Sequence, residues 1–294
     1  MKAFLAIEAV SRRKSAHSAG HVELPEAFVG LDFPEDADWE GLDDTDWSML
    51  RCGHGASVLG PDMQHIGAKQ FSMEFDNGGS AFEALRIANS SFDNCGMSLS
   101  KRPSRMSAVR DVHVSNCKVI NCEIGPTVLE DVQIDGLDVN PILLLWSCFF
   151  RRVSLAGKIG KIKINLEPFA FCNDAGVLAA FAERRAAFYE ATNWALDISR
   201  ARFVDFACKG VPLNLIKRDP QTQVIIQKRG FGGIDMLGSQ FADAFPETHA
   251  RLSIFSDSDA EEVLLVVPLA AARKRREDWA GGIAELRRLG IASE

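Results

Sequence analysis

Apolar side chains between residues 107 and 149 recur in pairs with a period of five, which suits neither a helix nor a plain strand. In DVHVSNCKVINCEIGPTVLEDVQIDGLDVN (residues 111–140), for example, Val112 and Val114 are followed by Cys117 and Val119. A simple amphipathic strand would alternate without a break. In an α-helix, five residues leave an apolar stripe about 140° out of register at every repeat. A chain that turns a corner every five residues can bury all of these pairs on one side.

The second residue of each pair is apolar at nine successive centre positions, and the residue two before each centre is small or apolar. These centres are Val109, Val114, Val119, Ile124, Leu129, Ile134, Val139, Leu144 and Phe149. The pattern also appears upstream in residues 80–97 and, in a new phase, downstream in residues 196–213, with a weaker continuation in residues 157–164. It is therefore an internal repeat that extends over a large part of the chain.

This pattern resembles that of the pentapeptide-repeat proteins, in which a small residue and, two positions later, a Leu or Phe point into a four-sided coil. The best single match is ARFVD, with Ala201 as the small inward residue and Phe203 as the centre. In most other repeats Val, Cys, Ser or Leu replaces the family's preferred Ala. The resemblance implies a mainly β fold, namely a right-handed parallel β-helix of about five 20-residue coils, with an inserted helix and α/β caps at its ends.

The remaining segments divide the chain into an acidic N-terminal capping region (1–79), the β-helix (80–214) and a C-terminal α/β cap (215–294). Residues 173–193 are predicted to form a helix inserted between two repeat blocks, with Asn173 or Asp174 as its N-cap. Val177, Leu178, Phe181, Phe188 and Tyr189 would form its apolar face. In the C-terminal cap, a turn at Asp219–Pro220 precedes a strand, and the strand EEVLLVVPL precedes a basic helix.

Four repeats would make one coil of 20 residues, so residues 20 apart should stack about 4.8 Å apart on neighbouring strands. Inside the coil, this register predicts that Cys117 stacks with Leu137, and Cys122 with Ile142 and Ile162. Outside it, the register predicts a column of Lys118, Asp138 and Lys158, and the pairs Arg110 with Glu130 and Asp131 with Arg151. These charges are interpreted as structural, because each exposed pair contributes only about 0.2–1 kcal/mol.

The net charge of −7 is unevenly distributed, since residues 1–79 hold 6 Lys or Arg against 14 Asp or Glu. The segment DFPEDADWEGLDDTDW (residues 32–47) has eight acidic residues and no basic one. Its simplest interpretation is a solvated loop held by its two tryptophans. The alternative is a candidate partner surface made of Asp36, Asp38, Trp39, Asp43, Asp44 and Trp47.

The sequence offers no motif for a catalytic, cofactor-binding or metal site, since phosphate loops, nucleophile elbows and HExxH are missing from it. Cys52 and His54 could be two metal ligands, but no second pair accompanies them. Seven cysteines without a CxxC pair favour free thiols in a reducing, cytoplasmic setting.

The start, MKAFLAIEAV, is predicted to be a strand rather than a signal peptide, because Glu8 interrupts its apolar run. No run is long enough for a membrane span.

Three functions fit these observations. The first, which we favour, is a non-enzymatic protein-binding or scaffold protein, as repeat solenoids commonly are; fold analogy suggests a bacterial accessory or immunity-type factor. Its partner would be another protein, with a homodimer through a coil end as a further arrangement.

The second function is a DNA mimic that shields a topoisomerase, as the resemblance implies, although the net charge of +3 over residues 80–165 argues against it. The acidic balance of the whole chain argues against nucleic acid as a partner. The third is a carbohydrate-active β-helix enzyme, with Asp131 and Asp135 as its nearest carboxylates.

Overall fold

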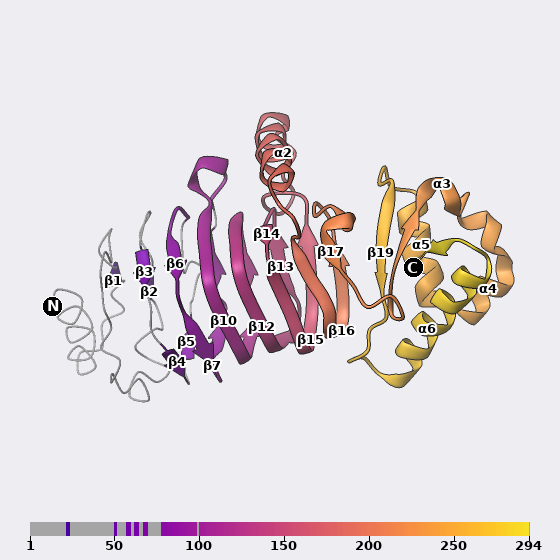
Figure 1. Ribbon diagram of the computed structural model, residues 1–294, viewed down its shortest axis with the longest axis horizontal. Coiled ribbons are helices and arrows are strands. Elements are labelled where there is room, and N and C mark those ends of the chain that lie inside the picture. The colour runs from indigo at the N-terminus through magenta and orange to yellow at the C-terminus, as the bar shows by residue number, and fades with distance from the viewer. Residues whose placement is uncertain are drawn as a thin grey trace.

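The computed structural model describes residues 78–98 and 100–293, together with five short strands that precede them. These strands are β1 (Val22–Glu23), β2 (Leu50–Arg51), β3 (Ser57–Leu59), β4 (Asp62–Gln64) and β5 (Gly67–Lys69). The described chain is mainly β, with a parallel sheet curled into a half-barrel and a smaller C-terminal unit beside it (Figure 1). The predicted N-terminal strand, most of the acidic capping region, Cys52 and His54 lie outside the described residues.

The sheet stacks successive segments of the chain, and every pairing recorded in it is parallel. It begins with β3, β4 and β5, which pair with the next three strands in turn. It continues with β6 (Ala81–Glu83), β7 (Arg86–Ala88), β8 (Ser91–Asp93), β9 (Gly96–Met97), β10 (Ser107–Ile120) and β11 (Glu123–Ile124). It continues with β12 (Thr127–Asn140), β13 (Leu143–Trp146), β14 (Phe149–Arg151), β15 (Val153–Asn165), β16 (Leu196–Cys208) and β17 (Ile216–Lys217). Short 3-10 turns lie at η3 (Pro103–Arg105) and η4 (Leu213–Leu215).

The 20-residue stacking is confirmed between β10 and β12. Their register runs without a shift from Ser107 opposite Thr127 to Ile120 opposite Asn140, so Lys118 lies opposite Asp138 as predicted. Cys117 lies opposite Leu137. Arg110 lies opposite Glu130 and forms an ion pair with it, with 3.0 Å between Nε and Oε2.

Residues with left-handed backbone angles recur at five-residue spacing within the sheet. They are Ala84, Asn89 and Asn94, then Asp111, Asn116 and Asn121, then Asp131 and Gly136, and then Ser147 and Arg152. Each of them immediately precedes a buried residue. Asn, Asp and Gly supply most of these positions, because they tolerate positive φ better than other residues do. Most of these positions are therefore marked in the sequence by Asn, Asp or Gly, and this signal is separate from the apolar pattern.

The predicted phase is wrong after Asn140, because one additional residue lies between β12 and β13. Ile124 pairs with Leu145 rather than Leu144, and Leu129 pairs with Phe150 rather than Phe149. Cys122 consequently neighbours Leu143 instead of Ile142, since the next residue, Glu123, pairs with Leu144. A corner can absorb one extra residue while the strands on either side keep their pairing.

The same shift changes one of the predicted charge pairs, that of Asp131 with Arg151. Arg151 lies opposite Glu130, and Asp131 instead forms its ion pair with Arg152. A second shift follows between Asp135 and Leu137, where Leu137 pairs with Ile159. A strict 20-residue spacing would place Lys158 opposite Asp138, but at this second shift the spacing has grown to 22 residues. The predicted column therefore ends at Asp138.

The interior of the sheet is filled by the paired positions of the repeat. Leu196, Ile198 and Phe203 are completely buried, and Ala201 is nearly so, which confirms the inward pairs predicted downstream of residue 195. Small polar residues at the first inward position, such as Ser107 and Thr127, are also buried. Thr127 satisfies its hydroxyl by donating to the Gly125 carbonyl at 3.1 Å. A hydroxyl group can therefore be buried in the core where a backbone carbonyl is placed to accept its hydrogen bond.

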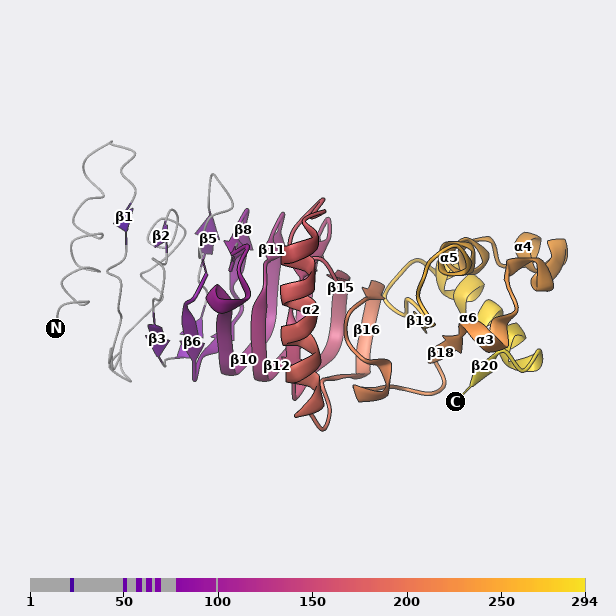
Figure 2. The ribbon, with the colours of Figure 1, turned by 90° about the horizontal axis from the view of Figure 1, so that it is seen from above.

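The predicted inserted helix is present as α2 (Ala175–Glu190), between β15 and β16. Asp174 is its N-cap, since its Oδ1 accepts from the backbone N–H groups of Gly176 at 2.9 Å and Val177 at 3.1 Å. The helix lies across the outer side of the sheet, over the region of β12 and β14 (Figure 2). It buries Phe149, which points outward from β14 and is completely covered.

The C-terminal unit (residues 223–293) combines a three-stranded antiparallel sheet with four helices among its described residues. Its strands, in the order β19-β18-β20, are β18 (Gln223–Gln227), β19 (Glu262–Val266) and β20 (Ala292–Ser293). Its helical elements are α3 (Lys228–Phe231), η5 (Ile234–Leu237), α4 (Gly238–Ala244), α5 (Pro246–Ser256) and α6 (Arg273–Arg288). The predicted strands and the basic helix correspond to β18, β19 and α6, whereas α4 and α5 were not predicted.

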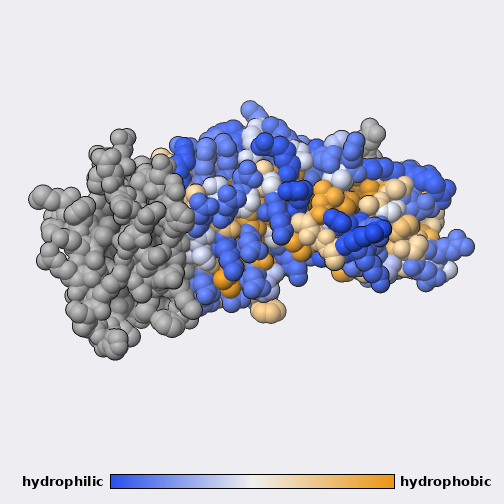
Figure 3. Space-filling view, turned by 90° about the horizontal axis from the view of Figure 1, so that it is seen from below, coloured by the Kyte–Doolittle hydropathy of each residue, from blue (hydrophilic) through white to orange (hydrophobic). Residues whose placement is uncertain are grey.

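This unit lies against the last long strand of the parallel sheet. The Ala270 N–H donates to the Phe203 carbonyl at 2.8 Å, and Gln223 Nε2 donates to the Ile198 carbonyl at 2.9 Å. Arg275 Nη1 donates to the Val204 carbonyl at 3.2 Å. These contacts occupy carbonyls along an edge of β16 that would otherwise be open to another strand. Apolar residues gather toward this unit in Figure 3, whereas hydrophilic residues cover most of the described sheet surface in that view.

Candidate functional site

The candidate partner surface of Asp36, Asp38, Trp39, Asp43, Asp44 and Trp47 lies outside the described residues. Within the described part of the chain, no group of three or more His, Cys, Asp or Glu side chains is arranged to hold a metal ion. No helix there is both long and apolar enough to cross a membrane.

Asp131, one of the two carboxylates suggested for glycoside chemistry, is engaged in an ion pair. Asp131 holds the Arg152 guanidinium at two points, 2.5 Å from Oδ1 to Nε and 2.6 Å from Oδ2 to Nη2. This hydrogen bonding keeps the pKa of Asp131 below its ordinary value, so the group is a poor proton donor near neutral pH. Glu130, one residue earlier, is held between Arg110 and Arg151 at 3.0 and 2.7 Å. These acids therefore serve as ion-pair partners on the sheet surface.

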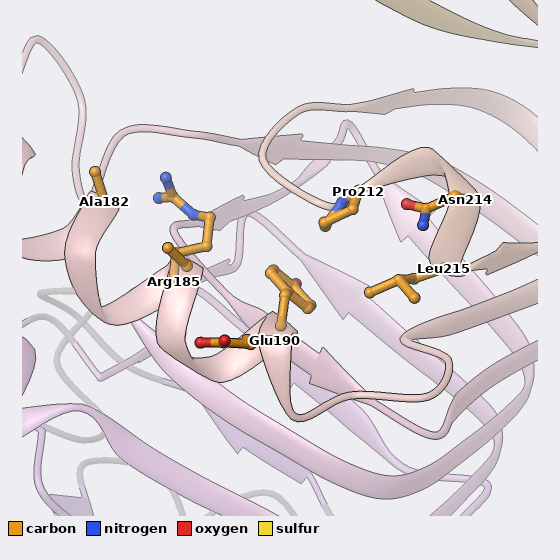
Figure 4. A pocket seen from close by; sticks show the side chains of 8 residues that line it. Ala182, Arg185, Glu190, Pro212, Asn214 and Leu215 are labelled. Carbon is orange, nitrogen blue, oxygen red and sulfur yellow. The ribbon is translucent and has the colours of Figure 1, made fainter.

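A groove lies between α2 and the segment that carries η4, with a volume of about 440 Å³. We call it the α2 groove; its lining residues are Ala182, Arg185, Ala186, Tyr189, Glu190, Pro212, Asn214 and Leu215. Figure 4 shows Arg185 and Glu190 on the helix side, and Pro212, Asn214 and Leu215 on the opposite side. The groove is mostly apolar, with a cation, a carboxylate and an amide among its lining groups.

The helix wall of the groove follows from the sequence of α2. Phe181 is buried against the sheet, which turns Ala182 and Ala186 away from that contact and leaves both exposed. Residues four apart lie on the same helix face, so these two methyl groups form a shallow floor. Tyr189 closes the floor toward the sheet, and its hydroxyl accepts a hydrogen bond from the Phe150 N–H at 3.2 Å. Burial raises the pKa of Tyr189, so its hydroxyl stays protonated.

Arg185 is the most unusual group in the groove. Its Nη2 donates to Ser147 Oγ at 2.8 Å and to the Leu166 carbonyl at 2.7 Å, and its guanidinium lies 5.8 Å from the centroid of the Phe149 ring. Among the described residues, no carboxylate forms an ion pair with it. Burial lowers its pKa, because the charge is removed from water without full compensation. Among the described residues, no hydrogen bond is formed by its Nε or Nη1.

The groove combines a mostly apolar lining with few titratable groups. Its lining holds a single carboxylate, Glu190, and none of its other residues is a histidine, cysteine or second acid. General acid–base chemistry needs a titratable group placed against a reacting atom, usually with a cooperating partner. A mostly apolar concave surface with a few polar groups instead suits recognition of another molecule.

Sequence reasoning assigned no role to Arg185, Glu190 or Asn214, although it predicted the helix that carries two of them. One signal was present, namely alanines at positions 175, 179, 182 and 186, which share one helix face. A helix that exposes such a face leaves room for another surface to approach closely. The opposite wall came from η4, which follows β16 and has no local link to α2.

Comparison of this chain with protein-family models, curated proteins and solved structures found no match.

Proposed function

We propose that this chain is a non-enzymatic binding protein, built on a right-handed β-helix of about five coils of the pentapeptide-repeat kind. The 20-residue register of β10 with β12 supports such coils. The left-handed residues at five-residue spacing support a corner between successive sides of each coil. A stacked body of this kind changes shape little, and it holds attached segments in fixed relative positions.

The α2 groove is the proposed binding site, and its ligand is a segment of another protein. The observation that carries this proposal is an exposed apolar floor beside the Arg185 guanidinium, which has hydrogen-bond partners but no ion-pair partner among the described residues. Burial of the Ala182 and Ala186 methyl groups and of Leu215 would supply affinity through the apolar area removed from water. Arg185, Glu190 and Asn214 would orient the segment through polar contacts.

The described charges favour neither of the other two functions. A DNA mimic would need acidic side chains along the length of the sheet, whereas Lys158, Lys161 and Lys163 are exposed on β15. A glycosidase would need two free carboxylates in one cleft, and Asp131 is engaged by Arg152. Protein binding agrees better with both observations.

A substitution that fills the groove tests this function. In Ala186→Arg the new side chain would occupy the floor, whereas in Ala180→Arg it would extend from the opposite, exposed side of α2. We expect the wild-type chain and Ala180→Arg to capture one stoichiometric protein from the source cells, and Ala186→Arg to lose it. Equal thermal stability of the two variants would exclude misfolding as the cause. Undiminished capture by Ala186→Arg would rule out this groove as the binding site.

A further inference from the structure

Two cysteines occupy equivalent positions on neighbouring segments of the parallel sheet. Cys95 precedes β9 and Cys122 precedes β11, and the residues that follow them, Gly96 and Glu123, are register partners. The Cys95 N–H donates to Cys122 Sγ at 3.4 Å, and the Glu123 N–H donates to the Cys95 carbonyl at 3.2 Å. Both side chains are thiols in this structure. Because the two residues lie side by side in the sheet, we call them the stacked thiols.

The other described cysteines of the sheet have different side chains beside them. The register places Leu137 beside Cys117, Thr127 beside Cys148 and Ile164 beside Cys208. Cys172 lies in the loop between β15 and α2. Within the described part of the chain, the sheet register therefore brings together only one pair of cysteines, the stacked thiols.

The backbone spacing at the stacked thiols suits a disulfide. Neighbouring strands lie about 4.8 Å apart, and the Cα atoms of two disulfide-bonded cysteines are usually about 4.4–6.8 Å apart. Their Cβ atoms are usually about 3.5–4.5 Å apart, which is slightly less than the strand spacing. A disulfide could thus form here without a change of register, but it would be strained. Strained disulfides are more easily reduced than relaxed ones, so the bond would be reversible.

The two thiols differ in acidity and are slightly more accessible than other cysteines of the sheet. Hydrogen bonding with the Cys95 thiol lowers the pKa of Cys122 despite its burial, and the Cys95 backbone N–H acts in the same direction. The thiol–thiol interaction, together with burial, raises the pKa of Cys95. Each of the two residues keeps 8% of its surface exposed, compared with 2% for Cys117 and Cys148. Cys122 is therefore the better source of thiolate, which is the form that attacks an oxidant.

We propose that the stacked thiols are a redox modification site, at which hydrogen peroxide forms a reversible disulfide between Cys95 and Cys122. The Cys122 thiolate attacks one oxygen of the peroxide, the O–O bond breaks, and the hydroxide that leaves takes up a proton to become water. The Cys95 thiol then loses its proton and attacks the sulfur of the Cys122 sulfenic acid, and the second water leaves as the S–S bond forms. Two thiols and one peroxide thus give one disulfide and two waters.

The disulfide would cross-link two layers of the sheet. It joins residues 27 apart in the chain, and it connects the segment that carries β6 to β9 with the segment that carries β10 and β11. Such a cross-link stabilises a fold chiefly by restricting the unfolded chain. The inference is independent of the proposed binding function, since neither cysteine lines the α2 groove.

Peptide mapping without reduction tests this site in the full-length protein. After brief treatment of the folded chain with hydrogen peroxide and blocking of the remaining thiols, we expect a linked peptide pair that contains Cys95 and Cys122 and that a dithiol reductant separates. Cys95→Ser and Cys122→Ser should each abolish this pair, whereas the matched control Cys117→Ser should retain it. Both serine variants should fold, because a backbone carbonyl already lies beside each thiol, that of Asp93 for Cys95 and that of Ile120 for Cys122.

Two further measurements check the consequence and the order of attack. Peroxide should raise the Tm of the wild type and of Cys117→Ser by several degrees, and it should leave the Tm of Cys95→Ser and Cys122→Ser unchanged. In Cys95→Ser, where the second thiol is missing, dimedone should label Cys122 as a sulfenic acid. A folded wild-type chain without the Cys95–Cys122 linkage after peroxide would overturn the proposal. So would a linkage that forms only in denaturant, or a Cys95→Ser variant that dimedone does not label.

Discussion

Asp131 on β12 forms a two-point ion pair with Arg152, the residue between β14 and β15, one position after the Arg151 that a strict 20-residue spacing would place there. Arg151 instead reaches Glu130, with 2.7 Å between Nη1 and Oε1. Both ion pairs join residues 21 apart, as expected from the single residue added after Asn140, and they fix the register of β14 and β15 on β12. Each of them can be tested separately.

The Asp131–Arg152 pair should make a small contribution to the free energy of unfolding, and only above acidic pH. Both side chains are about half exposed, so a double-mutant cycle with Asp131→Asn and Arg152→Gln should give a coupling energy of roughly 0.2–1 kcal/mol. The folded-state pKa of Asp131 is depressed, so the contribution is complete above the unfolded pKa of about 3.9 and is lost as pH falls through the lower folded value. Urea unfolding at pH 7 and pH 3 measures both effects. A cycle of Asp131 with Arg151 serves as control, and equal coupling there would contradict this register.

Phe149 should be among the most important residues for holding α2 on the sheet. It points outward from β14, is completely buried and lies 5.4 Å from the Phe188 ring, measured between centroids. Phe149→Ala should lower the free energy of unfolding by about 3–5 kcal/mol, because it removes a large buried side chain and leaves a cavity. The same change at Phe171, which is fully exposed, should alter it by less than about 0.5 kcal/mol. Comparable losses for the two variants would show that α2 does not cover Phe149.

Gly160 should tolerate no side chain, because the neighbouring strand approaches it closely. A Cβ at this position would lie 2.4 Å from Val139 Cβ and 2.8 Å from the Val139 amide nitrogen. Gly160→Ala should therefore cost about 1–3 kcal/mol through overpacking, as thermal or chemical unfolding would measure. Gly230→Ala is the control, since a Cβ there has nothing within 4 Å, and it should cause no loss. A stable Gly160→Ala variant would be inconsistent with the pairing of β12 and β15.

Cys148 should be unreactive in the folded protein. Its thiol is buried in the sheet, and burial raises its pKa to about 12. The thiolate is the nucleophile, so alkylation near pH 8 should be very slow for this residue until the chain unfolds. Cys172, which is only partly buried, should be alkylated in the native state. Peptide mapping after brief exposure to iodoacetamide, with and without denaturant, checks this; native labelling of Cys148 at the rate of Cys172 would be the contrary result.

The repeat itself was predictable from the sequence, because its cause is local. Two inward residues in every five set the period, and residues such as Asn116 and Asn121 allow the left-handed backbone that separates successive pairs. The 20-residue register between β10 and β12 follows from four uninterrupted repeats. The N-cap of α2 at Asp174 also depends only on its immediate neighbours along the chain.

Tertiary structure decided the rest, because the deciding contacts join residues far apart in the chain. The repeat pattern alone would place Phe149 on the inside of the sheet. Its side chain instead points outward, and it is buried only because α2, some 30 residues later in the chain, covers it. The extra residue after Asn140 leaves the local apolar pattern intact and becomes visible only when β14 pairs with β12. The α2 groove likewise exists because α2 and η4 meet across the sheet, a juxtaposition that no spacing in the sequence encodes.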